Sequence, residues 1–315
     1  MRTFRSIRTL AFGVAAFSAA PALAFDISTA QVGEIPVNQT VEMPFSSAMP
    51  LTAPSQAGSS VPSMDLAIPE QPEIGEKTSA AEAFHIGRNL LRRGDSAEAF
   101  TALQFASKEG HVGAHWMIGI MYESGEGFAQ NDLKAFEYFH EIVRNSDFVL
   151  LDDSVESRQN AAYVSQALVQ LGSYYREGIP GTHVKPNSQL AANLFSRAAY
   201  NYGEASAQYN LAVMYLEGNG VPQDQKRGMQ LLHLAAKKGH GPSRARLGHL
   251  MFASGKTKRE REVGLMWMNL ARQTAEQSGE DDAQWMIDLH EQAVAAASEE
   301  ERTGAAGFLQ RFFGN

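Results

Sequence analysis

The stretch that decides the fold is residues 203–224, GEASAQYNLAVMYLEGNGVPQD. Its small and apolar residues recur at i, i+4, i+5 and i+8, on one face of a helix: Ala207, Leu211, Ala212 and Tyr215. Gly218 follows this stripe, and Gly reaches the left-handed backbone conformation that ends a helix at little energetic cost. The stretch therefore predicts a helix, a Gly-terminated turn and a polar loop, with Leu211 in the core.

The same offsets return in three other places along the chain. A complete copy comprises Gly110, Ala114, Ile118, Gly119, Tyr122 and Gly125. A further copy lacks only the leading Gly: Ala167, Leu171, Gly172, Tyr175 and Gly178. The last copy begins as Gly239, Ser243, Leu247 and Gly248 and then degrades. Self-similarity of this kind is typical of a helical solenoid, in which each unit buries its apolar face only against its neighbours.

One position in every copy carries a small residue, and it predicts how the two helices of a unit meet. This position is occupied by Gly119, Gly172, Ala212 and Gly248. A small side chain lets a second helix approach the first closely, so each unit is expected to be a tightly packed helix pair. A solenoid of such pairs usually serves as a binding surface, which favours an interaction protein over an enzyme.

The pattern Ala-x3-Leu-Gly-x2-Tyr-x2-Gly-x-Gly-Val-x2-Asp, read best across residues 207–224, resembles the Sel1-like repeat, a relative of the tetratricopeptide repeat. The resemblance covers about residues 79–275. It implies an all-α fold, a right-handed α-solenoid of helix-turn-helix repeats. The chain departs from the pattern by an insertion near 148–160, by a loop lengthened at 181–184, and by loss of the Tyr in the fourth copy.

The first 24 residues resemble a secretory signal peptide. Arg2, Arg5 and Arg8 give a basic start, and a short apolar stretch ends in the small-x-small pattern of Ala22 and Ala24. The alternative is a membrane anchor, but the apolar stretch is too short to span about 30 Å of hydrocarbon. We therefore expect cleavage after Ala24 and no membrane insertion of the mature chain.

Residues 25–76 differ in composition from the rest of the chain. The segment is rich in Pro, Ser and Thr and has no Lys or Arg before Lys77. Such a segment buries too little apolar area to offset its chain entropy, so we expect a Pro-rich disordered arm. The alternative is an arm that binds a partner or is cut by a protease. The repeats are then expected over 77–275 and a cap of helices over 276–315.

The cap is predicted from a pattern near the C-terminus. Ser298-x-x-Glu301 is a capping-box sequence that begins a helix. An apolar face follows it, formed by Phe308, Leu309, Phe312 and Phe313. We interpret this helix as closing the last repeat, with a partner-docking tail as the alternative.

Charge and cysteine content limit the location and the partners. The whole chain has 27 Lys and Arg against 35 Asp and Glu, a formal charge of −8, and it contains no Cys. Loss of the three Arg in the leader would bring the charge to about −11, which disfavours nucleic acid as a partner. A leader without a lipid-attachment Cys favours the periplasm of a Gram-negative cell.

No motif for catalysis or for a cofactor is found. The sequence has no Gly-x-Ser-x-Gly, no His-Glu-x-x-His and no Cys nucleophile, so neither a cofactor nor an enzymatic activity is expected. His111 and His115 have the i, i+4 spacing of metal ligands, but His111 follows Gly110 just as His240 follows Gly239. We interpret them as residues of the repeat turn, and no metal site is expected. A hydrolase on the same scaffold remains as a minor alternative.

A second stripe on the first helix of each unit lies roughly opposite the core seam. By resemblance to tetratricopeptide arrays, this stripe lines the concave groove. Glu123 and Arg176 belong to it, but most of it is apolar, whereas an exposed helix face is ordinarily polar. Burial by neighbouring repeats is the alternative. The residues expected to bind a partner protein are Trp116, Ile120, Tyr209, Val213, Leu216 and Phe252.

The overall plan resembles the ExoR-type periplasmic regulators of exopolysaccharide synthesis: a signal peptide, a Pro-rich arm, Sel1-like repeats and a helical cap. The resemblance implies a negative regulator in two-component signalling. Such a protein binds the periplasmic sensing domain of a membrane histidine kinase and holds the kinase inactive, and proteolysis of the inhibitor releases the signal. The alternative is a periplasmic scaffold for envelope or polysaccharide assembly, without a signalling output.

Overall fold

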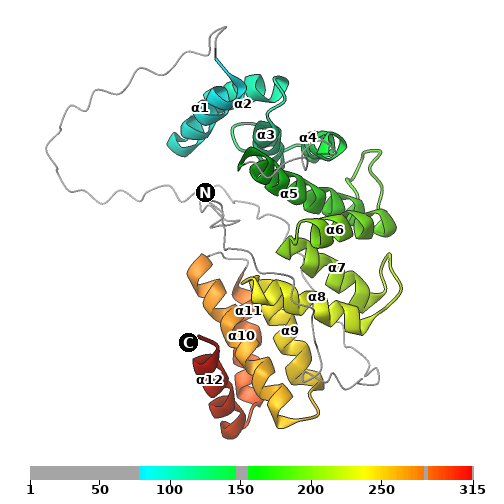
Figure 1. Ribbon diagram of the computed structural model, residues 1–315, viewed down its shortest axis with the longest axis vertical. Coiled ribbons are helices and arrows are strands. Elements are labelled where there is room, and N and C mark those ends of the chain that lie inside the picture. Colours follow the sequence, from blue (N-terminus) through cyan, green and yellow to red (C-terminus); the bar gives the residue numbers. More distant parts are fainter. Residues whose placement is uncertain (1–77, 147–154, 280–282, 314–315) are drawn as a thin grey trace, which may run out of the picture. The chain divides into compact units, whose positions relative to one another are not determined.

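The computed structural model describes residues 78–146, 155–279 and 283–313, and within these ranges the chain forms twelve α-helices and no β-strand (Figure 1). The helices group into two compact units, the first ending at His240 and the second beginning at Gly241. Among the described helices, none combines the length and the hydropathy that crossing a membrane requires. The expectation of an all-α repeat fold is confirmed.

The first unit is an α-solenoid of four consecutive helix pairs, each joined by a short loop. Its helices are α1 (Ala80–Arg93), α2 (Ser96–Lys108), α3 (Val112–Ser124), α4 (Asp132–Arg144), α5 (Val155–Glu177), α6 (Ser188–Asn201), α7 (Ala205–Glu217) and α8 (Gln225–Lys237). Each helix packs against its partner in the pair, and α2, α4 and α6 also pack against the first helix of the following pair, as Figure 1 shows for α3 to α8.

The ends of these helices follow from the repeated residues. The first helices α3, α5 and α7 each meet a Gly with a φ between 70° and 75°: Gly125, Gly178 and Gly218. The second helices α4, α6 and α8 each begin at a side chain that accepts a hydrogen bond from a backbone N–H three residues on, at 2.9–3.0 Å: Asn131, Asn187 and Asp224. The two signals are six residues apart in α3–α4 and in α7–α8, whereas the loop between α5 and α6 is three residues longer, so these three pairs share their helix ends but not the length of the turn.

The small residue of each copy lies where the two helices of a pair cross. A methyl group added to Gly119 would lie 2.5 Å from the Phe139 ring, and one added to Gly172 would lie 2.6 Å from the Phe195 ring. Both rings are fully buried. In the next pair the close approach involves Ala212 and Gly228. The predicted role of the small residue is therefore confirmed, as is the burial of Leu211, which is 0% exposed.

The second unit contains α9 (Gly241–Ser254), α10 (Lys258–Ser278), α11 (Gln284–Ala296) and α12 (Glu299–Phe313). The pair α9–α10 continues the repeat pattern, since Gly248 faces the backbone of Gly264. Both α11 and α12 pack against α10. The expected boundary between repeats and cap, at 275 and 276, falls inside α10, and the two compact units divide earlier, after His240.

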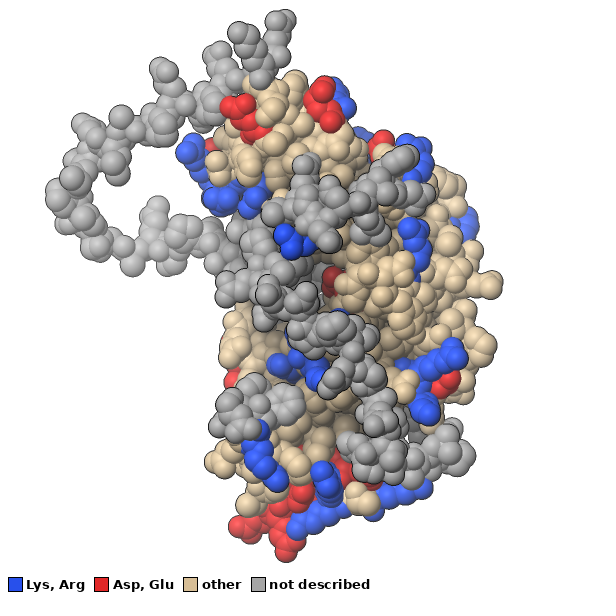
Figure 2. Space-filling model, viewed as in Figure 1, with Lys and Arg blue, Asp and Glu red and all other residues tan. Residues whose placement is uncertain are grey.

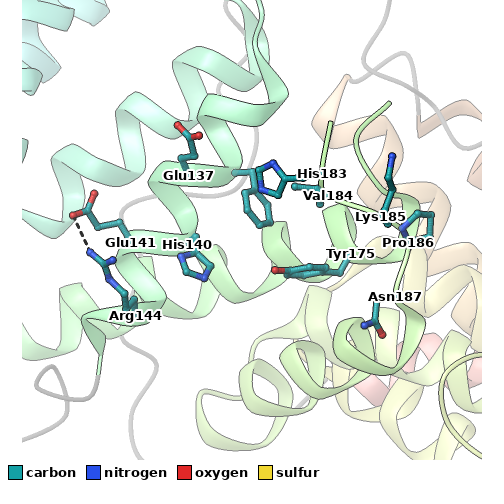
Figure 3. A pocket seen from close by; sticks show the side chains of 11 residues that line it. Glu137, His140, Glu141, Arg144, Tyr175, His183, Val184, Lys185, Pro186 and Asn187 are labelled. Carbon is teal, nitrogen blue, oxygen red and sulfur yellow. Dashed lines mark ion pairs between the residues drawn. The ribbon is translucent and has the colours of Figure 1, made fainter. Parts of the chain in front are cut away.

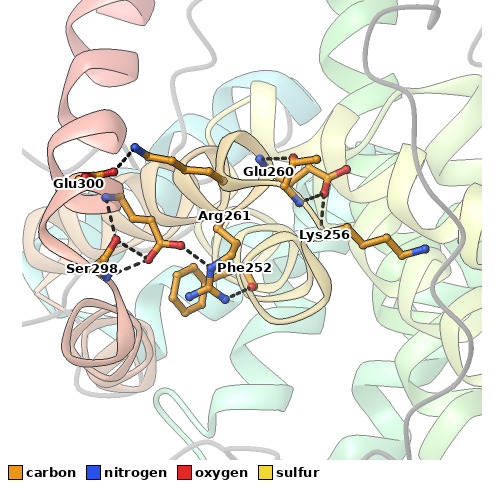
Figure 4. A network of polar contacts seen from close by, with 9 residues as sticks. Phe252, Lys256, Glu260, Arg261, Ser298 and Glu300 are labelled. Atoms are coloured by element: carbon orange, nitrogen blue, oxygen red, sulfur yellow. Dashed lines mark hydrogen bonds and ion pairs between the residues drawn. The ribbon is translucent and has the colours of Figure 1, made fainter.

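Charged side chains attach α12 to α10, and Figure 2 shows both signs of charge gathered side by side at this end of the unit. Arg261 Nε donates to Glu301 Oε1 at 2.5 Å, and the guanidinium also lies 4.0 Å from the centre of the Phe252 ring (Figure 4). Ser298 and Glu301 exchange the hydrogen bonds of a capping box, as the sequence pattern predicts. The hydrogen bond from Arg261, followed by that from the Ser298 N–H, lowers the pKa of Glu301 to about 2.

Several expectations fall outside the described residues. The signal peptide at 1–24 and the Pro-rich arm at 25–76 lie there entirely, so both remain predictions. The insertion near 148–160 lies there in part, and its described end belongs to α5, which begins at Val155.

The contact between Gly119 and Phe139 yields a direct test of the fold. Gly119→Ala should lower the free energy of unfolding, measured in urea, by about 1–3 kcal/mol because the added methyl group overlaps the ring. Helix propensity alone would raise it by about 1 kcal/mol. Gly307→Ala on α12, where nothing lies within 4 Å of the added methyl group, is the matched control and should be neutral or stabilising. Equal stability of Gly119→Ala and wild type would show that the helices do not cross here.

Candidate functional site

The first helices of consecutive pairs contact one another through a series of polar side chains. Tyr174 Oη on α5 donates a hydrogen bond to Glu123 Oε1 on α3 at 3.2 Å. Arg176, also on α5, donates from Nη1 to Asn210 Oδ1 on α7 at 2.7 Å. These two hydrogen bonds connect α3, α5 and α7 along one side of the first unit. We call this side, formed by α3, α5 and α7, the first-helix face.

Three of the predicted partner-binding residues of the first unit are half-buried and lie on α3 or α7. Trp116 and Ile120 are half-buried on α3, and the Trp116 ring lies 5.1 Å from the Phe139 ring, centre to centre. Tyr209 is half-buried on α7, with its ring 5.4 Å from that of His240. Two aromatic side chains are therefore held by ring contacts while part of each stays accessible.

Of the other three predicted residues, one is half-buried and two are buried. Leu216 is half-buried and packs against Gly228 of α8. Val213 is 8% exposed and Phe252 is 7% exposed. Phe252 belongs to the second unit, where it packs in a cluster with Leu265 and Met268. A buried side chain offers little area to a partner, so the half-buried Trp116, Ile120, Tyr209 and Leu216 are better candidates for direct contact than Val213 and Phe252.

The sequence pattern placed Glu123 and Arg176 on this stripe but did not predict their partners. Tyr174 occupies a position that is Met in two other copies, Met121 and Met214. A phenol in place of a thioether can donate a hydrogen bond, and this substitution was the available signal for the contact with Glu123. No comparable signal marks Asn210, whose equivalents differ in every copy.

The carboxyl group of Glu123 is the most perturbed acid of the first-helix face. Burial raises its pKa from 4.5 to about 7, the hydrogen bond from Tyr174 opposes this shift, and the nearby charge of Asp132 adds to it. Burial also raises the pKa of Tyr174. Near neutral pH, Glu123 is thus present in both protonation states, and its protonated form is the better suited to the partly buried position.

The paired histidines take structural roles. His111 Nδ1 accepts a hydrogen bond from the Ala114 N–H at the start of α3, and its ring stacks on Phe84 at 4.2 Å. His115 contacts Ser107 at 3.2 Å and Glu141 at 3.4 Å. In the part of the chain that the structure describes, no three His, Asp or Glu side chains gather as a metal site would require.

Comparison with known proteins agrees with the repeat pattern. The family model described as Sel1 repeat matches residues 112–147, 165–202 and 205–240. A protein named exopolysaccharide production negative regulator, from Rhizobium meliloti (strain 1021), is 33% identical over 228 residues, which is 72% of this chain and 80% of the relative. Its namesake from Rhizobium leguminosarum bv. viciae is 30% identical over 233 residues, 74% and 82% of the two chains. A solved Sel1 repeat protein from Oxalobacter formigenes is 21% identical, with a TM-score of 0.49 over 69% of this chain and 89% of that one.

The raised pKa of Glu123 predicts a pH-dependent stability. Below pH 4.5 the carboxyl group is protonated in both the folded and the unfolded state. Between pH 4.5 and 7 only the unfolded state loses the proton, so folding becomes less favourable as the pH rises. Glu123→Gln cannot ionise and should increase the free energy of unfolding at pH 8 by about 1–3 kcal/mol, with no gain at pH 4.

Urea unfolding of both proteins between pH 4 and pH 8 measures this difference. Glu98→Gln, which changes an exposed carboxylate on α2, is the matched control and should give curves parallel to those of wild type. A Glu123→Gln variant that is less stable than wild type at pH 8 would contradict the assignment of a protonated, poorly solvated carboxyl group.

Proposed function

Because the chain belongs to the family of Sel1-repeat proteins that includes the exopolysaccharide production negative regulators, we propose that it represses exopolysaccharide production by binding another protein. The observation that carries this proposal is the relationship to the Rhizobium meliloti regulator, which extends over 80% of that protein. A likeness over most of both chains supports a shared role better than shared repeats alone. The solenoid supports the binding mode, since stacked repeats present extended surfaces to partners.

We further propose that the partner is the sensing domain of a membrane histidine kinase and that the encounter takes place in the periplasm. The leader-like pattern of residues 1–24 supports export from the cytoplasm. A regulator outside the cytoplasm can influence gene expression only through a protein that crosses the membrane. A sensor kinase is such a protein, and its inhibition would account for negative regulation.

The first-helix face is the surface that we propose for this contact. Interface energy concentrates in aromatic residues that are rigidly held and only partly covered in the free protein. Trp116 and Tyr209 satisfy both conditions, because each is half-buried and fixed by an aromatic neighbour. The hydrogen bonds from Tyr174 to Glu123 and from Arg176 to Asn210 make the backbone between them rigid, which lowers the entropic cost of binding.

Capture of the partner tests the proposal at the level of the whole protein. A tagged chain should retain a histidine kinase from detergent-solubilised membranes, identified by mass spectrometry. Recovery of polysaccharide synthases or envelope assembly proteins in its place would favour the scaffold. Binding should then be measured with the purified sensing domain.

The Trp116→Ala/Tyr209→Ala variant should bind that sensing domain at least tenfold more weakly, a loss of about 1.4 kcal/mol. In cells it should raise exopolysaccharide output as deletion of the protein does. Tyr200→Ala, which removes a 61% exposed aromatic side chain on the second helix α6, is the matched control and should bind normally. Circular dichroism must show that both variants keep their helical content. A folded double variant that binds and represses normally would contradict the proposed surface.

A further inference from the structure

A pocket of about 590 Å³ lies on the first unit, between α4 and the loop at 178–187 that joins α5 to α6 (Figure 3). Its volume falls within the range of small-molecule sites, about 300–1,000 Å³. The rings of Phe136 and Tyr175 meet edge to face in the lining, with centres 5.5 Å apart. The pocket therefore combines an aromatic lining with the polar side chains described below.

The loop that forms one wall is peculiar to this helix pair. It has ten residues, whereas the loops at 125–131 and 218–224 in the neighbouring pairs have seven each. Ile179 and Val184 anchor it, being 6% and 3% exposed, and the Ile179 N–H donates to the Val184 carbonyl at 2.9 Å. Thr182 Oγ1 donates to the Ile179 carbonyl at 2.9 Å. The three additional residues thus form an ordered wall.

The charges around the opening are unequally paired. Glu141 already contacts two basic groups, His115 Nε2 at 3.4 Å and Arg144 Nη2 at 3.6 Å. Lys185 and His183 extend from the loop and are exposed, and among the described residues Lys185 has no acidic partner. On the opposite wall, α4 contributes the ring of His140 and the exposed carboxylate of Glu137, which has no basic partner among the described residues either, as Figure 3 shows. An ammonium group that has no carboxylate partner is available to an anion.

We propose that this pocket binds a sugar that carries a carboxylate group. The carboxylate would lie against Lys185 and His183, and the apolar face of the sugar ring would lie against Tyr175. The amide of Asn187 supplies further hydrogen bonds for hydroxyl groups. The choice of an anion rests on the unpaired ammonium group of Lys185, and the carboxylate of Glu137 on the opposite wall can accept hydrogen bonds from sugar hydroxyl groups. The choice of a sugar rests on the proposed function, since the relatives are named for exopolysaccharide production.

Isothermal titration of the full chain with a glucuronic acid disaccharide tests the proposal, and cellobiose serves as the neutral comparison. The acidic disaccharide should bind and cellobiose should bind at least tenfold more weakly. Added salt should weaken binding of the acid because the contact with Lys185 is exposed. Binding of both sugars with equal affinity, or of neither, would overturn the proposal.

Two variants locate the site. Lys185→Gln/His183→Gln should lose at least tenfold in affinity for the acidic disaccharide, and both side chains are exposed, so the fold should be kept. Lys226→Gln, which removes an exposed lysine at the start of α8, is the matched control and should bind as wild type does. Unchanged affinity of the double variant for the acidic disaccharide would overturn the assignment of the site to this pocket. Tighter binding of an Asp- and Glu-rich octapeptide than of the disaccharide would overturn the assignment of a sugar as the ligand. The proposed contact with a kinase lies on the first-helix face and does not include Lys185 or His183, so kinase capture tests the proposed function separately.

Discussion

The close crossing of two helices in each repeat is the contact on which the rest of the structure depends. Gly119 and Gly172 let the rings of Phe139 and Phe195 reach the backbone of the first helix, where both rings are fully buried. Burial of one such side chain contributes about 1.5–3 kcal/mol, and the same contact is repeated along the first unit. The buried apolar area lies inside each pair and also between neighbouring pairs, as in the cluster that joins α1, α2 and α3, and the positions outside it on the first helices carry polar residues and partly exposed rings.

This arrangement separates stability from binding. The core of each pair needs the small residue, the large residue that faces it and the buried apolar positions represented by Ile118, Leu171 and Leu211, so only the remaining positions of α3, α5 and α7 are free to vary. The hydrogen bonds from Tyr174 to Glu123 and from Arg176 to Asn210 occupy such positions and connect consecutive pairs. The longer loop before α6 is a second departure from the repeat, and it forms a wall of a pocket on another part of the unit.

Much of the fold could be predicted because its signals are local and repeated. Gly218 marks the end of α7, and the recurrence of Leu211 marks the buried seam. The site was predicted less completely, because contacts between pairs depend on how far each insertion shifts the next helix. Periodicity placed Glu123 on the stripe but did not predict its bond to Tyr174, and it did not distinguish the buried Phe252 from the half-buried Trp116. Residues 1–24 and 25–76 lie outside the described part, so the leader and the arm remain predictions.

Site-specific cross-linking in living cells tests most directly whether the first-helix face contacts the partner. A photoreactive phenylalanine analogue at Ile120, a half-buried position on that face, should form a covalent adduct with a membrane histidine kinase. The same analogue at Tyr200, an exposed position on α6, should give no such adduct. Adducts with the kinase from Tyr200 and none from Ile120 would contradict the account, because they would place the partner on the second helices.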